Sequence, residues 1–411
     1  MSRFDAVKSL EEIQPKLEEL YVELHQNPEL SMLEEETAQR LDGLLTDFGF
    51  ETMRIGGGVV GILKNGEGPA VLYRADIDGL PVEEATGLDY ASTKTQQDRN
   101  GATQHVMHAC GHDFHMTAGI GAAWVLANNK DAWSGTYVAL FQPAEETAEG
   151  ARSMVADGLV NKVNEKIGKL DVALAQHVLT VPESGKVGTT AGPVLSTAAS
   201  LRITVTGKGS HGSMPHLGID PILLASSIVV RLQGIVAREI APSDFAVVTV
   251  GSLQAGTQAN IIPNAATLLL NVRAYSNEIR EQLIEAIRRI VIAECEASGT
   301  EVEPSIEVYD EFPLTNNDEE VHEVVRSAFI EYFGEDRVEH LAPVTASEDF
   351  SIVPDAFGVP YCYWGFGGFE AGQQTYPNHN PHFGPTLQPT LRTGAEAAAT
   401  AALAYLGKGA N

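Results

Sequence analysis

Residues 70–81, AVLYRADIDGLP, decide the fold expected for this chain. The stretch is an apolar run that ends in two aspartates, Asp76 and Asp78. Such a run, closed by polar residues and a turn, is typical of a buried strand in a parallel sheet. Residues 136–146, TYVALFQPAEE, and 171–178, DVALAQHV, have the same form. The sequence therefore predicts three buried strands that each end in polar side chains.

Helical segments separate these strands. Patterns of helical period occur at 113–128 and 148–158, and an apolar stripe over 31–50 follows a predicted capping box from Ser31 to Glu34. Alternating strands and helices predict an α/β domain with a largely parallel sheet. Ligands of such sheets bind beyond the carboxyl ends of the strands. We therefore expect the polar strand ends to form one site.

The segment 188–303 has a different order of elements. Strands are expected at 201–209, 246–254, 266–276 and 301–309, with helices at 221–239 and 279–298. The order β-α-β-β-α-β predicts a ferredoxin-like unit inserted into the first domain. The chain then returns to the first domain, where a helix is expected at 319–333 and strands near 359–366. We therefore expect one domain from 1–187 and 304–411, and a second from 188–303.

Composition limits the classes of function. The chain has 411 residues, which favours two domains, and a formal net charge of −28, which disfavours binding to nucleic acid. The first 20 residues lack an apolar region, and no 18 consecutive residues are apolar, so we expect a cytoplasmic protein with no membrane partner. Three cysteines do not suggest a disulfide framework, and Cys295 and Cys362 are predicted to be core residues.

Residues 105–115, HVMHACGHDFH, concentrate metal-ligand side chains. Thiolate and imidazole are preferred ligands of zinc and related divalent ions, so we expect Cys110 and His112 to bind metal. His105 and His115 are expected to be ordinary residues. A zinc nucleobase deaminase would need H-x-E and P-C-x-x-C motifs, and neither occurs.

The adjacent carboxylates Glu145 and Glu146 follow the second strand. Neighbouring side chains point differently, so one can bind metal while the other acts as general base towards water. Two solvated glutamates at a helix start are the alternative, which the preceding apolar strand disfavours. His177 ends the third strand and could be a core histidine or a ligand. One or both of His379 and His382, in NHNPHF, could close the metal site.

Three side chains of the inserted segment could bind an oxyanion or a carboxylate. His211 lies in the glycine-rich stretch 207–216, Asn260 lies at a strand end, and Arg273 lies on a strand.

Eight motifs together resemble the amidohydrolase branch of the aminoacylase and carboxypeptidase G superfamily, which includes hippurate hydrolases and plant hydrolases of auxin–amino acid conjugates. In chain order they are RADIDGLPVEE, HACGHDFH, FQPAEETAEGA, AQHV, GSHGSMPHLGIDP, NIIPN, ASEDF and NHNPHF. The resemblance covers nearly the whole chain, from about His25 to the C-terminal helix. It implies a phosphorylase/hydrolase-like α/β domain with two divalent metal ions and a satellite domain that forms a homodimer.

The resemblance also implies roles for individual residues. Cys110 would bridge the metals, with Glu146 and His379 completing one site, and His112 and His177 the other. Asp78 would orient the ligands, and Glu145 would be the general base. His211, which would reach across the dimer, would bind substrate with Asn260 and Arg273.

Two positions depart from the pattern. The wider superfamily has H-x-D where this chain has Asp76-Ile77-Asp78, and Phe114 stands where this branch usually has glycine. We expect Phe114 to narrow the substrate pocket.

The sequence therefore predicts hydrolysis of the amide bond of N-acyl amino acids, of hippurate or N-acetyl type, with release of a carboxylic acid and an amino acid. Manganese or zinc is expected, and cobalt or nickel would also suit these ligands. The alternatives are a carboxypeptidase or dipeptidase of the same superfamily, and a non-catalytic binding protein on the same fold.

Overall fold

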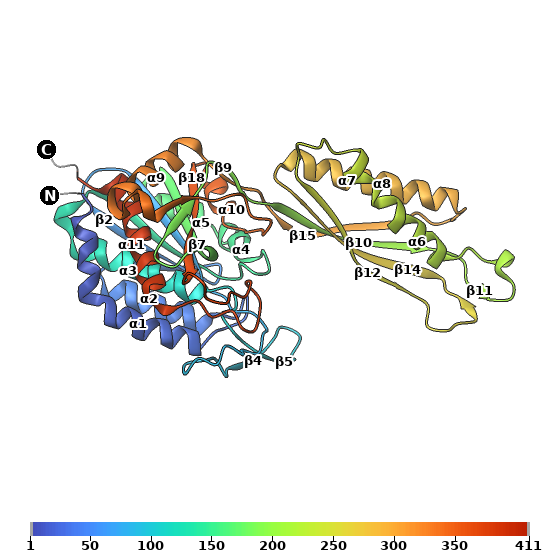
Figure 1. Ribbon diagram of the computed structural model, residues 1–411, viewed down its shortest axis with the longest axis horizontal. Helices are drawn as coiled ribbons and strands as arrows, with labels where there is room; N and C mark the ends of the chain where they lie inside the picture. The colour runs from blue at the N-terminus through green and yellow to red at the C-terminus, as the bar shows by residue number, and fades with distance from the viewer. Residues whose placement is uncertain (1–2, 409–411) are drawn as a thin grey trace. The chain divides into compact units, whose positions relative to one another are not determined.

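The computed structural model describes residues 3–408, which divide into two compact units (Figure 1). Unit 1 runs to Val194 and continues with Asn316–Pro343 and from Asp349 onward. Unit 2 comprises Leu195–Thr315 and Val344–Glu348. The predicted boundaries, 187/188 and 303/304, did not include the short return of 344–348 to unit 2. The observed units meet at 194/195, within β9 (Gly192–Leu195), and at 315/316, within β16 (Thr315–Asn317).

Unit 1 is built on a mixed eight-stranded sheet in the order β1-β2-β6-β3-β7-β18-β8-β17. Its four central strands, β6, β3, β7 and β18, are parallel, as the buried apolar runs predicted. The strands are β1 (Glu51–Ile55), β2 (Gly58–Asn65), β3 (Ala70–Asp76), β6 (Gly135–Gln142), β7 (Val172–Glu183), β8 (Val187–Thr189), β17 (Val338–His340) and β18 (Tyr361–Phe369), with a separate hairpin of β4 (Thr95–Gln97) and β5 (Thr103–His105).

Helices cover this sheet. α3 and α11 pack against each other and against the central strands, and both are buried along most of their length. The helices of unit 1 are α1 (Leu10–Gln26), α2 (Glu35–Asp47), α3 (His112–Asn128), α4 (Gly150–Ala156), α5 (Leu159–Ile167), α9 (Glu319–Phe333), α10 (Ile352–Phe357) and α11 (Leu387–Leu406).

The predicted capping box at Ser31 is wrong. α2 begins at Glu35, and its first-turn amides of Glu36 and Thr37 donate to the carboxylate of Glu29 instead. Because Glu29 satisfies these amides, the Ser31 hydroxyl donates to Oδ2 of Asp78, at 2.7 Å.

Phe114 does not narrow a pocket in unit 1. Its side chain is fully buried, and its ring lies 4.4 Å from the ring of Tyr21, between α3 and α1. Phe114 is therefore a core residue.

Unit 2 has the predicted β-α-β-β-α-β order. Its antiparallel four-stranded sheet, in the order β12-β14-β10-β15, carries helices α6 and α8 on one face (Figure 1). The predicted helix at 221–239 is divided into two at Gln233. The elements are β10 (Thr197–Thr206), β11 (Ser210–His211), α6 (Pro221–Leu232), α7 (Gly234–Arg238), β12 (Ala246–Ala255), β13 (Ile261–Ile262), β14 (Ala265–Ala274), α8 (Asn277–Ala297) and β15 (Ser305–Phe312).

Among the described residues, one helical stretch, Pro221–Arg238, is long and apolar enough to span a membrane by length and composition alone. In unit 2 it packs Leu224, Ile228 and Leu232 into the core of the sheet. Its opposite side leaves Leu223 and Val230 67% and 74% exposed, an apolar face without a partner in unit 2.

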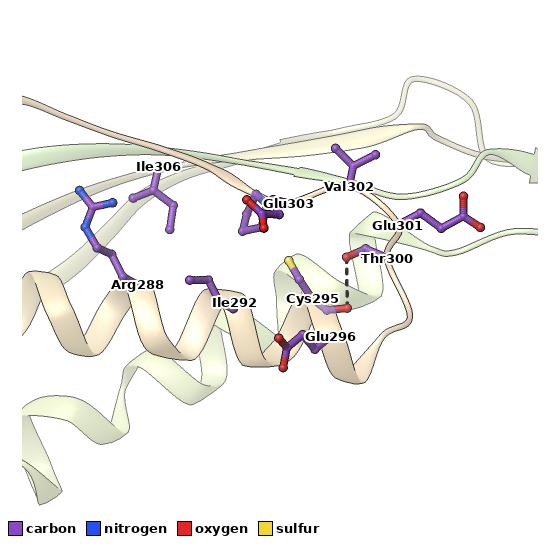
Figure 2. Close-up of a pocket in the computed structure, with 10 residues that line it drawn as sticks. Arg288, Ile292, Cys295, Glu296, Thr300, Glu301, Val302, Glu303 and Ile306 are labelled. Carbon is purple, nitrogen blue, oxygen red and sulfur yellow. Dashed lines mark hydrogen bonds between the residues drawn. The ribbon is translucent and has the colours of Figure 1, made fainter.

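A hollow of about 380 Å³ lies in unit 2 between α8 and residues 300–306 (Figure 2). Cys295 lines it, but this side chain is 3% exposed and belongs to the core, as the sequence predicted. Burial raises the pKa of its thiol above the usual value. A neutral, buried thiol is a poor nucleophile, so Cys295 is not a candidate catalytic residue.

Candidate metal centre

The predicted ligands of unit 1, with Asp78 and Glu145, come together from five segments. β3 leads to Asp78, β6 leads to Glu145 and Glu146, and β7 carries His177. Gly111 separates Cys110 from His112, the first residue of α3, and His379 lies in the loop before α11. His177 does not end its strand as predicted, because β18 pairs with β7 on both sides of it and the strand continues to Glu183.

The ligand atoms form two groups that share Cys110. Cys110, His112 and His177 form one group, and Cys110, Glu146 and His379 form the other. Within each group the ligand atoms lie within 4.8 Å of one another. Donors bound at about 2.0–2.3 Å to one ion lie within such a distance of each other. The arrangement therefore fits two neighbouring ions with the Cys110 sulfur between them.

Individual distances agree with this grouping. Sγ of Cys110 lies 3.4 Å from Nε2 of His177, and Nε2 of His379 lies 3.1 Å from Oε2 of Glu146. Nε2 of His112 lies 3.8 Å from Oε1 of Glu146, and neither of these two buried atoms has a hydrogen-bond partner among the described residues. Buried polar atoms without a partner are costly unless a bound ion or ligand satisfies them. The atoms present thus fit a metal chemically as well as geometrically.

Hydrogen bonds fix the tautomers of two ligand histidines. Nδ1 of His112 lies 2.9 Å from the carbonyl oxygen of Asp78, and Nδ1 of His177 lies 2.7 Å from that of Val178. A carbonyl can only accept, so each Nδ1 carries a proton, and Nε2 is the nitrogen left to bind a metal when the ring is neutral. This arrangement is typical of metal-binding histidines.

The charges around these ligands favour a cation. Burial lowers the pKa of His112, but the carboxylates of Asp76 and Asp78 outweigh it and raise that pKa to about 10. Burial, with the charges of Glu146 and Glu145, raises the pKa of the Cys110 thiol well above its usual range. A metal ion bound at the Cys110 sulfur would lower this pKa again, because a thiol that coordinates a metal loses its proton.

Asp78 orients three groups of the site. Its Oδ2 accepts from the Ser31 hydroxyl, at 2.7 Å, and from the amide of Glu146, at 3.1 Å. Its Oδ1 lies 3.2 Å from Nδ1 of His112. Asp78 therefore contacts the ring of His112 and the backbone amide of Glu146.

Glu145 lies beside the ligands and belongs to neither of the groups that share Cys110. It is 6% exposed, and its Oε2 lies 3.9 Å from Nε2 of His112. A carboxylate at this distance can exchange a proton with a water molecule bound next to His112.

A third possible ligand group, formed by Asp76, His112 and His115, is less suited to metal. Nε2 of His115 accepts from the amide of Val178, at 2.9 Å, so the ring donates through Nδ1 to Asp76, at 2.6 Å. The other oxygen of Asp76 accepts from the guanidinium of Arg74, also at 2.6 Å. Both side chains are thus already committed to other partners.

The sequence did not predict these hydrogen bonds, which support the candidate ligands. His115 was expected to be an ordinary residue, yet it braces Asp76 and the backbone next to His177. Arg74 is fully buried and bonds to Asp76, Gln142 and Asp349. A charged residue inside an apolar strand must be paired, so Arg74 was the signal that could have revealed this network.

Two further residues lie in the loop that carries His379. The side-chain amide of Asn378 lies 3.5 Å from Sγ of Cys110, a contact that the sequence did not suggest. His382 points its Nδ1 to the carbonyl oxygen of Ala85, at 2.6 Å, and belongs to none of the ligand groups.

In unit 2, His211 and Asn260 lie together. β11 pairs with β13, and the amide of Gly212 donates to the carbonyl oxygen of Asn260, at 2.8 Å. The amide of Ser213 donates to Nδ1 of His211, at 3.1 Å, so the exposed ring carries its proton on Nε2. His211 therefore presents a hydrogen-bond donor to the surroundings of unit 2.

Arg273 does not lie with these two residues. It is near the Ala274 end of β14, where its guanidinium donates to the carbonyl oxygen of Thr345, at 2.6 Å. At a rise of about 3.3 Å per residue, Arg273 is roughly 25 Å from the Ala265 end of that strand. β11 lies beyond that opposite end of unit 2 (Figure 1).

Curated relatives match most of the chain. It is 35% identical to an N-acetyl-L-cysteine deacetylase of Bacillus subtilis over 84% of this chain and 79% of the relative. It is 36% identical to a hippurate hydrolase of Campylobacter jejuni over 86% of this chain and 88% of that hydrolase. It is also 33% identical to thermostable carboxypeptidase 2 of Saccharolobus solfataricus over 97% of this chain and 98% of that carboxypeptidase.

A solved structure and a family model agree with these relatives. The crystal structure of a dinuclear metal-binding M20 peptidase from Bacillus subtilis superposes with a TM-score of 0.78, at 27% identity, over 96% of this chain and 98% of the other. The model of the peptidase family M20/M25/M40 matches residues 72–404. The resemblance drawn from the eight motifs is thereby confirmed, and the chain belongs to the peptidase family M20/M25/M40.

Proposed function

We propose that this protein is a metal-dependent amidohydrolase that cleaves the amide bond of N-acyl amino acids to a carboxylic acid and an amino acid. The observation that carries the proposal is the pair of ligand groups sharing Cys110, with Glu145 beside them. Relatives of similar length include a deacetylase of N-acetyl-L-cysteine and a hydrolase of hippurate, both of which cleave such a bond.

Two divalent ions would be held by five residues. Cys110 would bridge them, with His112 and His177 completing one site, and Glu146 and His379 the other. Such ions lower the pKa of a water molecule towards neutrality and polarise a carbonyl oxygen. Mixed sulfur, nitrogen and oxygen ligands suit manganese or zinc, and also cobalt or nickel.

Glu145 would be the general base. Its carboxylate would take a proton from the attacking water and then deliver that proton to the leaving nitrogen of the amide. Asp78 would keep the His112 ring and the Glu146 backbone aligned during both steps, through the contacts described above.

Unit 2 would supply the groups that bind the substrate. The Nε2–H of His211 is suited to an oxyanion, Arg273 to a carboxylate, and Asn260 to either. His211 and Arg273 lie at opposite ends of unit 2, too far apart for one small substrate to reach both. Their joint action therefore requires a second chain, with His211 reaching the site of its partner.

Unit 2 also offers surfaces for a homodimer. β12 lies at an edge of its sheet, and the outer face of α6 exposes Leu223 and Val230. Exposed apolar helix faces and open strand edges are typical contact surfaces. A cytoplasmic location is part of the proposal, and it agrees with three free cysteines among the described residues.

A carboxypeptidase remains the second candidate, because a thermostable carboxypeptidase matches nearly the whole chain. It would use the same metal ligands and the same base on a peptide bond. The two candidates differ in the acyl side of the substrate, which is a simple acid in one and a peptide in the other.

The test is hydrolysis by metal-stripped protein with and without added Mn²⁺ or Zn²⁺. The panel contains hippurate, N-acetyl amino acids, dipeptides and N-blocked peptides. Metal-dependent release of amino acid from the first two supports the amidohydrolase, whereas cleavage of peptides alone supports the carboxypeptidase. Glu145→Gln should abolish hydrolysis and keep both metals, and inactivity of the wild type on every substrate would contradict both candidates.

A further inference from the structure

The backbone immediately before Glu145 has an unusual conformation. Ala144 has a φ of +47°, in the left-handed region that a residue with a Cβ rarely adopts. Ala144 is fully buried and directly precedes the two glutamates of the site. Strained backbone of this kind persists only where the surroundings impose it. Something in unit 1 must therefore hold the Ala144 peptide in place.

Glu34 holds the amide of Ala144. The carbonyl oxygen of Ala144 accepts from the amides of Glu149 and Gly150, at 3.3 and 3.1 Å. Oε1 of Glu34 accepts a hydrogen bond from the amide of Ala144, at 2.7 Å, although the two residues are 110 positions apart in the chain. The Glu34 side chain belongs to a residue that is only 4% exposed. Without this bond, the buried amide of Ala144 would lack an acceptor, and the strained conformation would lose the support on its amide side.

The loop that carries Glu34 is itself anchored to the site. The amide of Gly79 donates to the carbonyl oxygen of Glu29, at 2.6 Å, and the amide of Leu30 donates to Oε1 of Gln96, at 2.7 Å. Ser31 donates to Asp78, which in turn accepts from the amide of Glu146. One loop thus fixes the backbone on both sides of Glu145.

We propose that Glu34 is a positioning residue, which sets the direction of the Glu145 carboxylate by holding Ala144 in its left-handed conformation. The inference rests on the proposed role of Glu145 as general base. It assigns a function to the Leu30–Glu34 segment, which supplies no metal ligand. It also explains why a buried carboxyl group lies here without a basic partner among its described contacts.

The role does not need a charge on Glu34. Burial, together with the charge of Asp78, raises the pKa of Glu34 to about 8. Either form of the carboxyl group keeps an oxygen that can accept from an amide, and so does glutamine. Glu34→Gln should therefore preserve the bond, whereas Glu34→Leu removes it.

The first experiment compares kcat, KM and metal content of these two variants on the best N-acyl amino acid. Small misplacements of catalytic groups cost up to about 100-fold in rate, so Glu34→Leu should lower kcat by about 10- to 100-fold. KM should stay within about twofold, and both metals should remain bound. Glu34→Gln should keep most of kcat. Glu35→Leu is the matched control, because the neighbouring Glu35 is largely exposed and pairs with Arg54.

A second substitution separates positioning from folding. Glycine adopts positive φ without support, so Ala144→Gly added to Glu34→Leu should recover part of the lost kcat. Amide hydrogen exchange of a peptide covering residues 141–149 reports the same bond without catalysis. Exchange at Ala144 should be faster in Glu34→Leu than in Glu34→Gln.

Three results would overturn the inference. They are an unchanged kcat in Glu34→Leu, an equal loss in Glu34→Gln, and identical exchange at Ala144 in the two variants. Failure of the base assignment is distinguishable, because Glu145→Gln would then stay active whatever the Glu34 variants do.

Discussion

Cys110 is the residue on which both ligand groups depend. Its sulfur belongs to the group with His112 and His177 and to the group with Glu146 and His379. As the proposed bridge, the Cys110 thiolate would bring one negative charge to two cations, which water or a neutral side chain would not supply. Mutation of residues that only support ligands lowers metal affinity by about 10–100-fold. Loss of the Cys110 sulfur should therefore lower metal affinity by more.

We therefore expect Cys110→Ala to lose both metals and His379→Ala to lose one. The reason is that His379 belongs to a single group, whereas Cys110 belongs to both. Metal content per chain, measured after dialysis by elemental analysis, checks this. Cys295→Ala in unit 2 is the control and should keep both ions. Retention of two tightly bound ions by Cys110→Ala would disprove the bridge.

His25 is a second residue with a measurable effect, on stability. Its ring is buried between two carboxylates, with Nδ1 2.6 Å from Asp113 and Nε2 3.1 Å from Glu84. The rings of Tyr21 and Tyr90 pack on it. Burial lowers the pKa of His25, but the hydrogen bonds to Asp113 and Glu84 outweigh it and raise the pKa from 6.5 to about 9.

A raised pKa means that the folded state binds the proton more tightly than the unfolded state does. This stabilisation is fully present below about pH 6.5 and is lost as pH rises through about 9. Below about pH 6.5, protonated His25 contributes on the order of 3 kcal/mol to the free energy of unfolding. The carboxyl pKa values of Asp113 and Glu84 are lowered despite burial, so their contribution is lost instead on acidification.

We expect the difference in unfolding free energy between the wild type and His25→Gln to be constant from about pH 5 to 6.5 and to shrink between 6.5 and 9. Urea unfolding followed by tryptophan fluorescence measures it, because Trp124, Trp133 and Trp364 all lie in unit 1. His216→Gln, at an exposed position of unit 2, is the control. A difference that grows with pH would contradict the assignment of a cationic His25.

At the scale of elements, the start of α3 places the ligands. Gly111 lies between Cys110 and His112 with a φ of +81°, and a Cβ there would be 2.3 Å from Cγ1 of Val178 on β7. The close approach of α3 to β7 brings His112 and His177 into one group. A side chain at position 111 would push these two elements apart.

Gly111→Ala should therefore lose metal and activity, and destabilise unit 1 beyond the roughly 1–2 kcal/mol that a left-handed residue costs. Gly168→Ala is the matched control, because Gly168 has a φ of +84° with open space around it. It should show only the conformational cost and full activity. Thermal unfolding and metal content distinguish the two, and equal behaviour would show that contact with β7 is unimportant.

At the scale of the whole molecule, the proposed dimer can be tested by mixing. His211→Ala and Glu145→Gln should each be inactive alone. If His211 serves the partner's site, mixed dimers contain one site with both residues intact, so activity should partly return after the variants are unfolded and refolded together. Absence of any recovery, with mixed dimers demonstrated, would place His211 and Glu145 in the same chain's site.

The surface of α6 gives a second test at this scale. Charges on an exposed apolar face disfavour its burial, so Leu223→Glu with Val230→Glu should shift the protein towards monomers. Light scattering after size-exclusion chromatography measures the mass. The monomer should keep its metals, because the proposed ligands all lie in unit 1, and lose activity. A dimer of unchanged stability would exclude α6 from the interface.

Much of this organisation followed from the sequence alone. Apolar runs determine buried strands, and polar residues directly after them determine where a site forms, because parallel strands end at the same edge of a sheet. Asp78, Glu145 and Glu146 could be predicted for this reason, whereas Cys110 and His112 were predicted from the concentration of thiol and imidazole side chains in residues 105–115. The β-α-β-β-α-β order of unit 2 also follows from local periodicity.

The tertiary structure decided what depends on distant partners. Ser31 looked like a helix cap, but Glu29 takes that role and Ser31 bonds to Asp78. His115 and Glu34 act through contacts 39 and 110 positions away, and Arg74 bonds to Asp349, 275 positions away. The separation of His211 from Arg273 likewise depends on the length and pairing of β14. Local patterns specify which elements form, whereas the pairing of buried polar groups is settled only when the elements pack, since burial is what makes an unpaired group costly.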